Sequence, residues 1–185
     1  SLTTLPATEF PNVEDCDQSY ELSLPQEKLR HLIDQTGFSM AQQDVRYYLN
    51  GLMLNISNKK MKLVASDGHR LAVYEDEIDE MTGYEATIVL PRKGVVELNR
   101  LLEDSEEKID VQFSNNNIKI QINDLTFAAK LIDAKYPGFD KVFHQDFLTF
   151  ISIPKLSFIP NFSALVCRYG KSNVSPLYVV TICGW

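Results

Sequence analysis

The feature that most constrains the fold of this chain is an internal repeat. A short alternating segment ending in Pro25 leads into a helical pattern and then into three strand-like segments, and the same order recurs around Pro91, about 66 residues later. Each unit has to bury its helix against its strands, so the repeat predicts one α+β domain with pseudo-two-fold symmetry. We expect each proline to open its helix at the first helical position, which needs no backbone N–H.

The first unit begins with an alternating strand at 20–24. The helix that follows Pro25 has an apolar face with helical spacing, made by Leu29, Leu32, Ile33 and Thr36. After an irregular connector at 37–45, strand-like patterns run over 46–56, 61–66 and 69–78. Turn residues at 58–59 and 67–68 separate them, which predicts a three-stranded antiparallel meander.

The second unit repeats this order. A strand at 86–90 precedes the helix of Pro91, whose inward face is predicted to hold Val95, Leu98, Leu101 and Leu102. Alternating apolar residues then predict strands at 109–113, 118–122 and 125–131, with turns at 114–116 and 123–124.

The Asp67-Gly68 turn is the first candidate functional feature. Asp-Gly between two strand-like runs favours a tight hairpin, because glycine supplies a positive φ. His69 and Arg70 follow at once, beside Leu71, so local sequence leaves both a plain turn and a binding edge open. A catalytic site of His69 with Asp67 and Arg70 is disfavoured, because neither a nucleophile nor a metal-binding cluster accompanies them.

Basic residues gather on the outer faces of both predicted helices. They are Lys28, Arg30 and His31 on the first, and Arg92, Lys93 and Arg100 on the second. Either face alone is typical of a solvated helix surface. Two such faces related by the repeat, on a chain of formal charge −7, favour a surface directed at a polyanion.

Composition limits the remaining classes. The sequence holds no apolar run of the ~20 residues that a membrane span needs and no visible secretory signal. Cys16, Cys167 and Cys183 are scattered without a CxxC pair, which favours free thiols in a reducing compartment and no zinc site. Charge also divides the chain, because every acidic residue lies in 1–146 and 147–185 carries only basic ones. The division predicts a boundary near residue 146.

Several blocks closely resemble the bacterial replicative sliding clamp family, the β subunit of DNA polymerase III. They are Met40–Gly51, Val64–Val73, Val89–Val95, Lys130–Asp133 and Tyr136-Pro137. The resemblance implies the middle of the family's three domains at 19–146, entered through an interdomain linker at 1–18. It implies the DNA-clamp fold, in which two helices pack on two four-stranded antiparallel sheets.

The resemblance also implies a function. Six such domains form a head-to-tail dimeric ring around duplex DNA, tether the polymerase and make replication processive. The subunit is non-catalytic, needs no cofactor or metal and works in the cytoplasm. Its partners are duplex and single-stranded DNA, the polymerase α subunit, the clamp loader and other proteins with a clamp-binding motif. Sliding suits phosphate attraction that is weak and salt-dependent.

Two sets of site residues are implied by matching positions. A peptide-binding pocket would be built from Leu49, Ser66, Gly68, His69, Arg70, Leu71, Pro137, Lys141 and Val142. DNA contacts would come from the loop residues Gln43, Arg46, Tyr47 and Tyr48, and from the helix residues Lys28, Arg30, Arg92, Lys93 and Arg100. For Tyr47 and Tyr48, one core and one surface aromatic on a strand is the alternative interpretation.

The resemblance ends near Phe147. Residues 147–185 are dense in Phe, Ile, Ser and Pro and match nothing in the family's third domain. We interpret them as a truncated or frameshifted tail with little order, with a lineage-specific C-terminus as the alternative. Without the first and third domains we do not expect this chain alone to close a ring, and we expect weakened peptide affinity. The alternative function is a free-standing module that binds peptides or single-stranded DNA.

Overall fold

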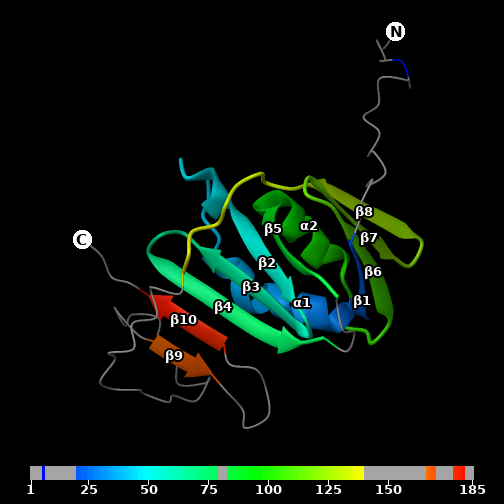
Figure 1. Cartoon of the computed structure of the whole chain (residues 1–185), viewed down its shortest axis with the longest axis horizontal. Helices are drawn as coiled ribbons and strands as arrows, with labels where there is room; N and C mark the ends of the chain where they lie inside the picture. Colours follow the sequence, from blue (N-terminus) through cyan, green and yellow to red (C-terminus); the bar gives the residue numbers. More distant parts are fainter. Residues whose placement is uncertain (1–5, 7–19, 79–82, 140–165, 170–176, 182–185) are drawn as a thin grey trace.

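The computed structural model describes residue 6, residues 20–78 and 83–139, and the backbone of 166–169 and 177–181. Within these ranges the chain forms two α-helices and two sheets, and Figure 1 shows how they are arranged. In chain order the elements are β1 (Tyr20–Pro25), α1 (Gln26–Thr36), the 3-10 turns η2 (Gly37–Ser39) and η3 (Tyr47–Asn50), β2 (Gly51–Ser57), β3 (Lys60–Ser66), β4 (Arg70–Glu77), β5 (Glu85–Pro91), α2 (Arg92–Leu101), β6 (Lys108–Phe113), β7 (Asn117–Ile122), β8 (Leu125–Lys130), β9 (Val166–Tyr169) and β10 (Leu177–Thr181).

The two repeat units exchange their first strands. The smaller sheet has the order β1-β6-β7-β8 and the larger one β5-β2-β3-β4-β10-β9. By sequence β1 belongs to the first unit, yet it pairs with β6 of the second, and β5 pairs in turn with β2 of the first. The predicted fold of two helices and two four-stranded antiparallel sheets is confirmed, with β10 and β9 added to one sheet. The exchange ties both units into a single domain.

Each helix begins one residue later than predicted. Pro25 and Pro91 are N-caps with extended backbone, at φ −61°, ψ 142° and φ −65°, ψ 144°, and each is also the last residue of its strand. A proline there still costs no hydrogen bond, because the free N–H groups of the first turn follow it. For α1 the backbone supplies the acceptors, since Gln26 N–H donates to Glu107 O and Glu27 N–H to Ser105 O, each at 3.0 Å.

The four-stranded part of the larger sheet is buried on both faces. One face packs on α1, which contacts β3 and β4, and on α2, which contacts β2 and β5. This helix-side core includes Leu52, Leu63 and Leu98, each at most 2% exposed. The opposite face carries a second cluster, here the pocket-side core, composed of Ala41, Leu49, Met53, Val64, Leu71, Val73, Val89 and Tyr136. Alternate residues of the same strands supply the two cores.

The strand predicted over 46–56 was wrong for its first residues. Residues 47–50 form η3, and β2 begins only at Gly51. The side-chain amide of Asn50 closes the preceding loop, because its Nδ2 donates to Asp44 O at 2.8 Å and its Oδ1 accepts from Asp44 N–H at 2.9 Å. Such side-chain-to-backbone bonds compete with a strand ladder.

Gly51, the first residue of β2, allows β2 to lie close to β5. A Cβ at this position would lie 2.5 Å from Leu90 O, on the neighbouring strand β5. Only glycine permits this approach of two backbones.

The tail contributes two described strands. β10 pairs antiparallel with β4, with Val179 opposite Ala72, and β9 pairs with β10. In Figure 1 these strands lie along the outer edge of β4. Strands β9 and β10 are the described part of the tail, and the expectation that 147–185 has little order stays a prediction. The rest of the tail, like the predicted linker at 1–18 except residue 6, lies outside the described residues.

Candidate functional site

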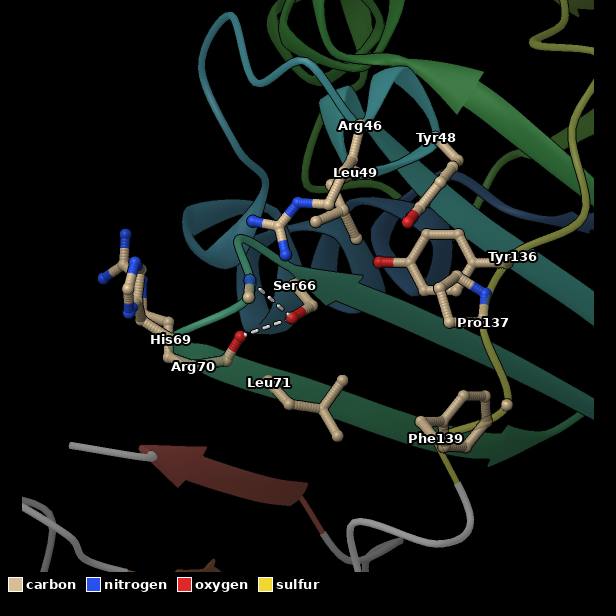
Figure 2. A pocket seen from close by; sticks show the side chains of 12 residues that line it. Arg46, Tyr48, Leu49, Ser66, His69, Arg70, Leu71, Tyr136, Pro137 and Phe139 are labelled. Atoms are coloured by element: carbon tan, nitrogen blue, oxygen red, sulfur yellow. Dashed lines mark hydrogen bonds between the residues drawn. The ribbon is translucent and has the colours of Figure 1, made fainter. Parts of the chain in front are cut away.

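A cavity of about 210 Å³ opens on the pocket-side core. It lies where the β3–β4 turn, η3 and the segment after β8 meet (Figure 2). Its lining is Arg46, Tyr48, Leu49, Ser66, Gly68, His69, Arg70, Leu71, Tyr136, Pro137, Gly138 and Phe139. The predicted pocket residues from Leu49 to Pro137 all line this cavity, which we call the groove. Lys141 and Val142 lie outside the described residues.

The groove has an apolar floor. Leu49 and Leu71 are each 4% exposed and belong to the pocket-side core, so their upper surfaces close the cavity from below. Pro137 and the half-buried Phe139 form the far wall, and Lys62 Nζ lies 5.8 Å from the Phe139 ring centroid. A floor that is part of a packed core cannot collapse easily, so the cavity is preformed.

The turn beside the groove is fixed by its own hydrogen bonds. Asp67 Oδ1 accepts from the backbone N–H groups of His69 and Arg70 at 2.9 and 3.0 Å, and Gly68 has φ +88°. Ser66 Oγ donates to Arg70 O at 2.8 Å and accepts from Gly68 N–H at 3.1 Å. Partial burial opposes ionisation of Asp67, but the bonds from His69 and Arg70 hold its pKa below the usual value.

Arg70 turns its charge away from the floor. Its Nε lies 3.0 Å from Asp67 Oδ2, and its Nη2 donates to Phe38 O at 2.8 Å. The guanidinium also lies 5.7 Å from the ring centroid of Phe38, which is 47% exposed. Figure 2 shows the side chains of His69 and Arg70 pointing outward, so they form a rim around an apolar floor.

Arg46 belongs to the wall of the groove. Its Nη2 lies 2.8 Å from Asp44 Oδ2 and 3.3 Å from Asp67 O, which ties the loop before η3 to the β3–β4 turn. The hydrogen bond from Arg46 lowers the pKa of Asp44 to about 2. Sequence reasoning placed Arg46 only among the DNA contacts, and that role stays a prediction beside this structural one.

The two neighbouring tyrosines have different environments. Tyr47 is 58% exposed, whereas Tyr48 is half-buried in the groove wall, with its ring centroid 6.5 Å from that of Tyr136. Gln43 is also exposed and has φ 56°. An exposed tyrosine can stack on a base, and the DNA contacts of Tyr47 and Gln43 stay a prediction.

The basic helix residues mostly have partners within the chain. Lys28 Nζ donates to Glu77 O and lies 3.7 Å from Asp76 Oδ2. The remaining hydrogen bonds are Arg30 Nη1 to Leu102 O, Arg92 Nη1 to Met40 O, and Arg100 Nη1 to Glu97 Oε1. Lys93 is exposed, and no described residue bonds its side chain. The helices do lie together, since Asn99 Nδ2 donates to Asp34 Oδ1 at 2.8 Å.

Among the described residues, no group of three or more His, Cys, Asp or Glu side chains could hold a metal ion. Over the same part of the chain, no helix is long and apolar enough to cross a membrane.

Fold and groove together define a DNA-clamp domain. The profile of the family described as "DNA polymerase III beta subunit, central domain" matches residues 23–138. The chain belongs to this family. It is 45% identical to the beta sliding clamp of Proteus mirabilis over 144 residues, covering 77% of this chain and 39% of that protein. With the beta sliding clamp of Escherichia coli K12 the identity is 44% over 142 residues, covering 77% and 38%.

Solved structures agree with this assignment. The DNA polymerase III β subunit of Pseudomonas aeruginosa is 41% identical, with a TM-score of 0.72, and the match covers 76% of this chain and 39% of that one. The DNA polymerase sliding clamp of Bacillus subtilis gives a TM-score of 0.72 at 26% identity, covering 77% and 37%. The chain thus spans about two fifths of the length of these relatives. The family is that of the clamp, a non-catalytic subunit that serves DNA replication.

Proposed function

We propose that this chain presents a peptide-docking groove as the central domain of a replicative sliding clamp. The observation that carries the proposal is the apolar floor of Leu49 and Leu71 beside a turn fixed by Asp67 and Ser66. At about 210 Å³ the cavity is smaller than the ~300 Å³ of a small ligand site. It suits one or two apolar side chains of an extended peptide.

The groove suggests the kind of peptide, and the sliding-clamp family suggests which proteins carry it. A short peptide containing glutamine and leucine or phenylalanine would place its apolar side chains on the floor and its polar groups against the rim. Such segments would come from the polymerase α subunit, the clamp loader and other clamp-binding proteins, acting in the cytoplasm. As part of a ring around duplex DNA, the domain would hold these proteins near the template and so provide processivity.

Peptide binding tests the proposal directly. We expect a fluorescein-labelled peptide of this type to gain anisotropy with the 185-residue chain, and His69→Ala to weaken binding at least about fivefold. His31→Ala is the matched control, because His31 is also exposed but lies on α1 and contacts Tyr74. Absence of binding at high micromolar protein, or equal loss in both variants, would contradict the assignment of the groove.

The proposed DNA contacts rest on a weak attraction between phosphates and the basic residues of the two helices. Because Lys28, Arg30, Arg92 and Arg100 have partners within the chain, phosphates must compete for them. We expect duplex DNA binding that is weak and that falls steeply with added salt. Tight binding that salt does not affect would contradict a sliding surface.

A free-standing module is the second candidate, and the exposed Tyr47 favours its single-strand form. Stacking of a base on Tyr47 predicts that Tyr47→Ala weakens oligo-dT binding, while Tyr20→Ala, on β1, does not. Ring closure distinguishes the two candidates. A chain that stays monomeric in solution and is not retained on circular DNA would act as the free-standing module.

A further inference from the structure

Tyr136 places a buried polar atom beside the groove. Its side chain is 8% exposed, and its ring lies in the pocket-side core near Tyr48. In Figure 2 its hydroxyl is directed toward the space between Arg46 and Ser66. Neither the periodicity of the strands nor the family resemblance assigns it a role.

No described residue accepts a hydrogen bond from this hydroxyl. A buried hydroxyl proton without an acceptor is unfavourable, because folding removes its hydrogen bond to water and does not replace it. Burial raises the pKa of Tyr136 to about 12, opposed by the Ser66 backbone amide and reinforced by Asp67. The group therefore keeps its proton at neutral pH and is available as a donor.

The polar neighbours of Tyr136 are already engaged. Ser66 Oγ donates to Arg70 O, and the Arg46 guanidinium is held by Asp44 and by Asp67 O. None of these groups lies in hydrogen-bond geometry with the Tyr136 hydroxyl, so a ligand in the groove can supply the acceptor.

We propose that the Tyr136 hydroxyl donates a hydrogen bond to a carbonyl oxygen of the peptide that occupies the groove. The inference rests on the proposed peptide-binding function and names one anchoring contact within it. Solvent barely reaches the hydroxyl in the free chain, so we expect the contact to form only when a side chain of the groove wall shifts as the peptide binds. The carbonyl belongs either to the glutamine side chain or to the peptide backbone.

Tyr136→Phe tests the contact in the full 185-residue chain, with fluorescence anisotropy of the labelled glutamine-containing peptide. We expect binding about fivefold weaker than for the wild type, with a thermal unfolding midpoint that is equal or higher, because the free chain loses a buried hydroxyl without an acceptor. Tyr20→Phe is the control, because Tyr20 lies on β1 and packs on Tyr84 and Phe113. Equal binding by wild type and Tyr136→Phe overturns the inference, whereas absence of binding by the wild type contradicts the proposed function itself.

Edited peptides identify the acceptor and do not depend on how the variant folds. One peptide replaces glutamine with norleucine, and a series replaces each backbone carbonyl in turn with a methylene group. We expect one of these peptides to bind the wild type about fivefold more weakly than the unedited peptide does. The same edited peptide should bind Tyr136→Phe with the affinity it has for the wild type, because both changes remove the same hydrogen bond. The norleucine peptide reports the side chain, and a methylene peptide reports the backbone. Additive losses for every edited peptide would show that the hydroxyl acts only within the fold.

Discussion

The guanidinium of Arg46 lies directly over Gly68, where a Cβ would come within 2.6 Å of Arg46 Nη2. The same guanidinium forms an ion pair with Asp44 at 2.8 Å. The loop before η3 and the β3–β4 turn are therefore joined through a position that has no side chain. This contact shapes one wall of the groove.

Gly68→Ala should strain this wall. Gly68 has φ +88°, which costs an alanine roughly 1–3 kcal/mol, and the added Cβ would displace the Arg46 side chain. We expect the free energy of unfolding in urea to fall by about 1 kcal/mol and peptide binding to weaken. Gly83→Ala is the control, since a Cβ at Gly83 meets nothing within 4 Å. Equal free energies of unfolding for Gly68→Ala and Gly83→Ala would contradict this prediction, because they would show that the turn accepts a side chain at position 68 without strain.

Two further glycines should respond with opposite signs. In Gly51→Ala the Cβ would lie 2.5 Å from Leu90 O, a backbone atom that cannot move alone, so we expect a loss of at least about 2 kcal/mol. In Gly94→Ala the new Cβ would make ordinary contacts at 3.6 Å inside α2, so we expect a gain of about 0.5–1 kcal/mol. Urea denaturation of both variants checks the pair. A destabilised Gly94→Ala would contradict the packing of α2.

The Asp44–Arg46 ion pair should survive to low pH. The pKa of Asp44 in the fold is about 2 against an ordinary 3.8, so the pair is complete above about pH 4 and is lost as the pH falls through 2. We expect the NMR titration of the Asp44 carboxyl carbon to move toward 3.8 in Arg46→Gln. Arg100→Gln should leave it unchanged, because Arg100 pairs with Glu97 on α2. An identical midpoint in all three chains would contradict the contact.

The tail strand β10 should protect the edge of β4. Thr181 lies opposite Arg70 and Leu177 opposite Tyr74. Removal of 147–185 leaves this edge unpaired, and unpaired edges associate with other chains. We expect faster amide exchange at alternate residues of 70–74 and concentration-dependent association, with exchange on β7 unchanged as the internal reference.

Amide exchange in the full chain also tests the origin of the tail. Protected amides in 166–169 and 177–181 would contradict a frameshifted tail without an evolved fold. Free exchange there would contradict the pairing of β10 with β4.

Much of the fold was predictable because it is periodic. Leu29, Leu32 and Ile33 repeat at helical spacing and are all buried, and the repeat around Pro25 and Pro91 predicted the sheets. The exchange of β1 and β5 was not predictable, because sequence order does not say which sheet a strand joins. The tail strands were missed because 147–185 carries no clear alternation.

The groove was predictable only in part. Its turn residues stand out through Asp67-Gly68, and the family resemblance supplied Leu49 and Pro137. Arg46, Tyr48 and Tyr136 were missed as groove residues, because they lie in irregular segments that fold against the sheet through particular contacts. The Tyr-Pro dipeptide at 136–137 was a signal that could have been followed.

The most direct test of the central claim is to map where the peptide binds by backbone amide chemical shifts of the 15N-labelled chain. The account predicts shifts confined to residues 46–49, 66–71 and 136–139, which line the groove or adjoin it. The amide chemical shifts of β7 and of the exposed face of α2 should not change. Saturable chemical-shift changes on those elements, with no change at the groove residues, would contradict the assignment of the groove as the docking site.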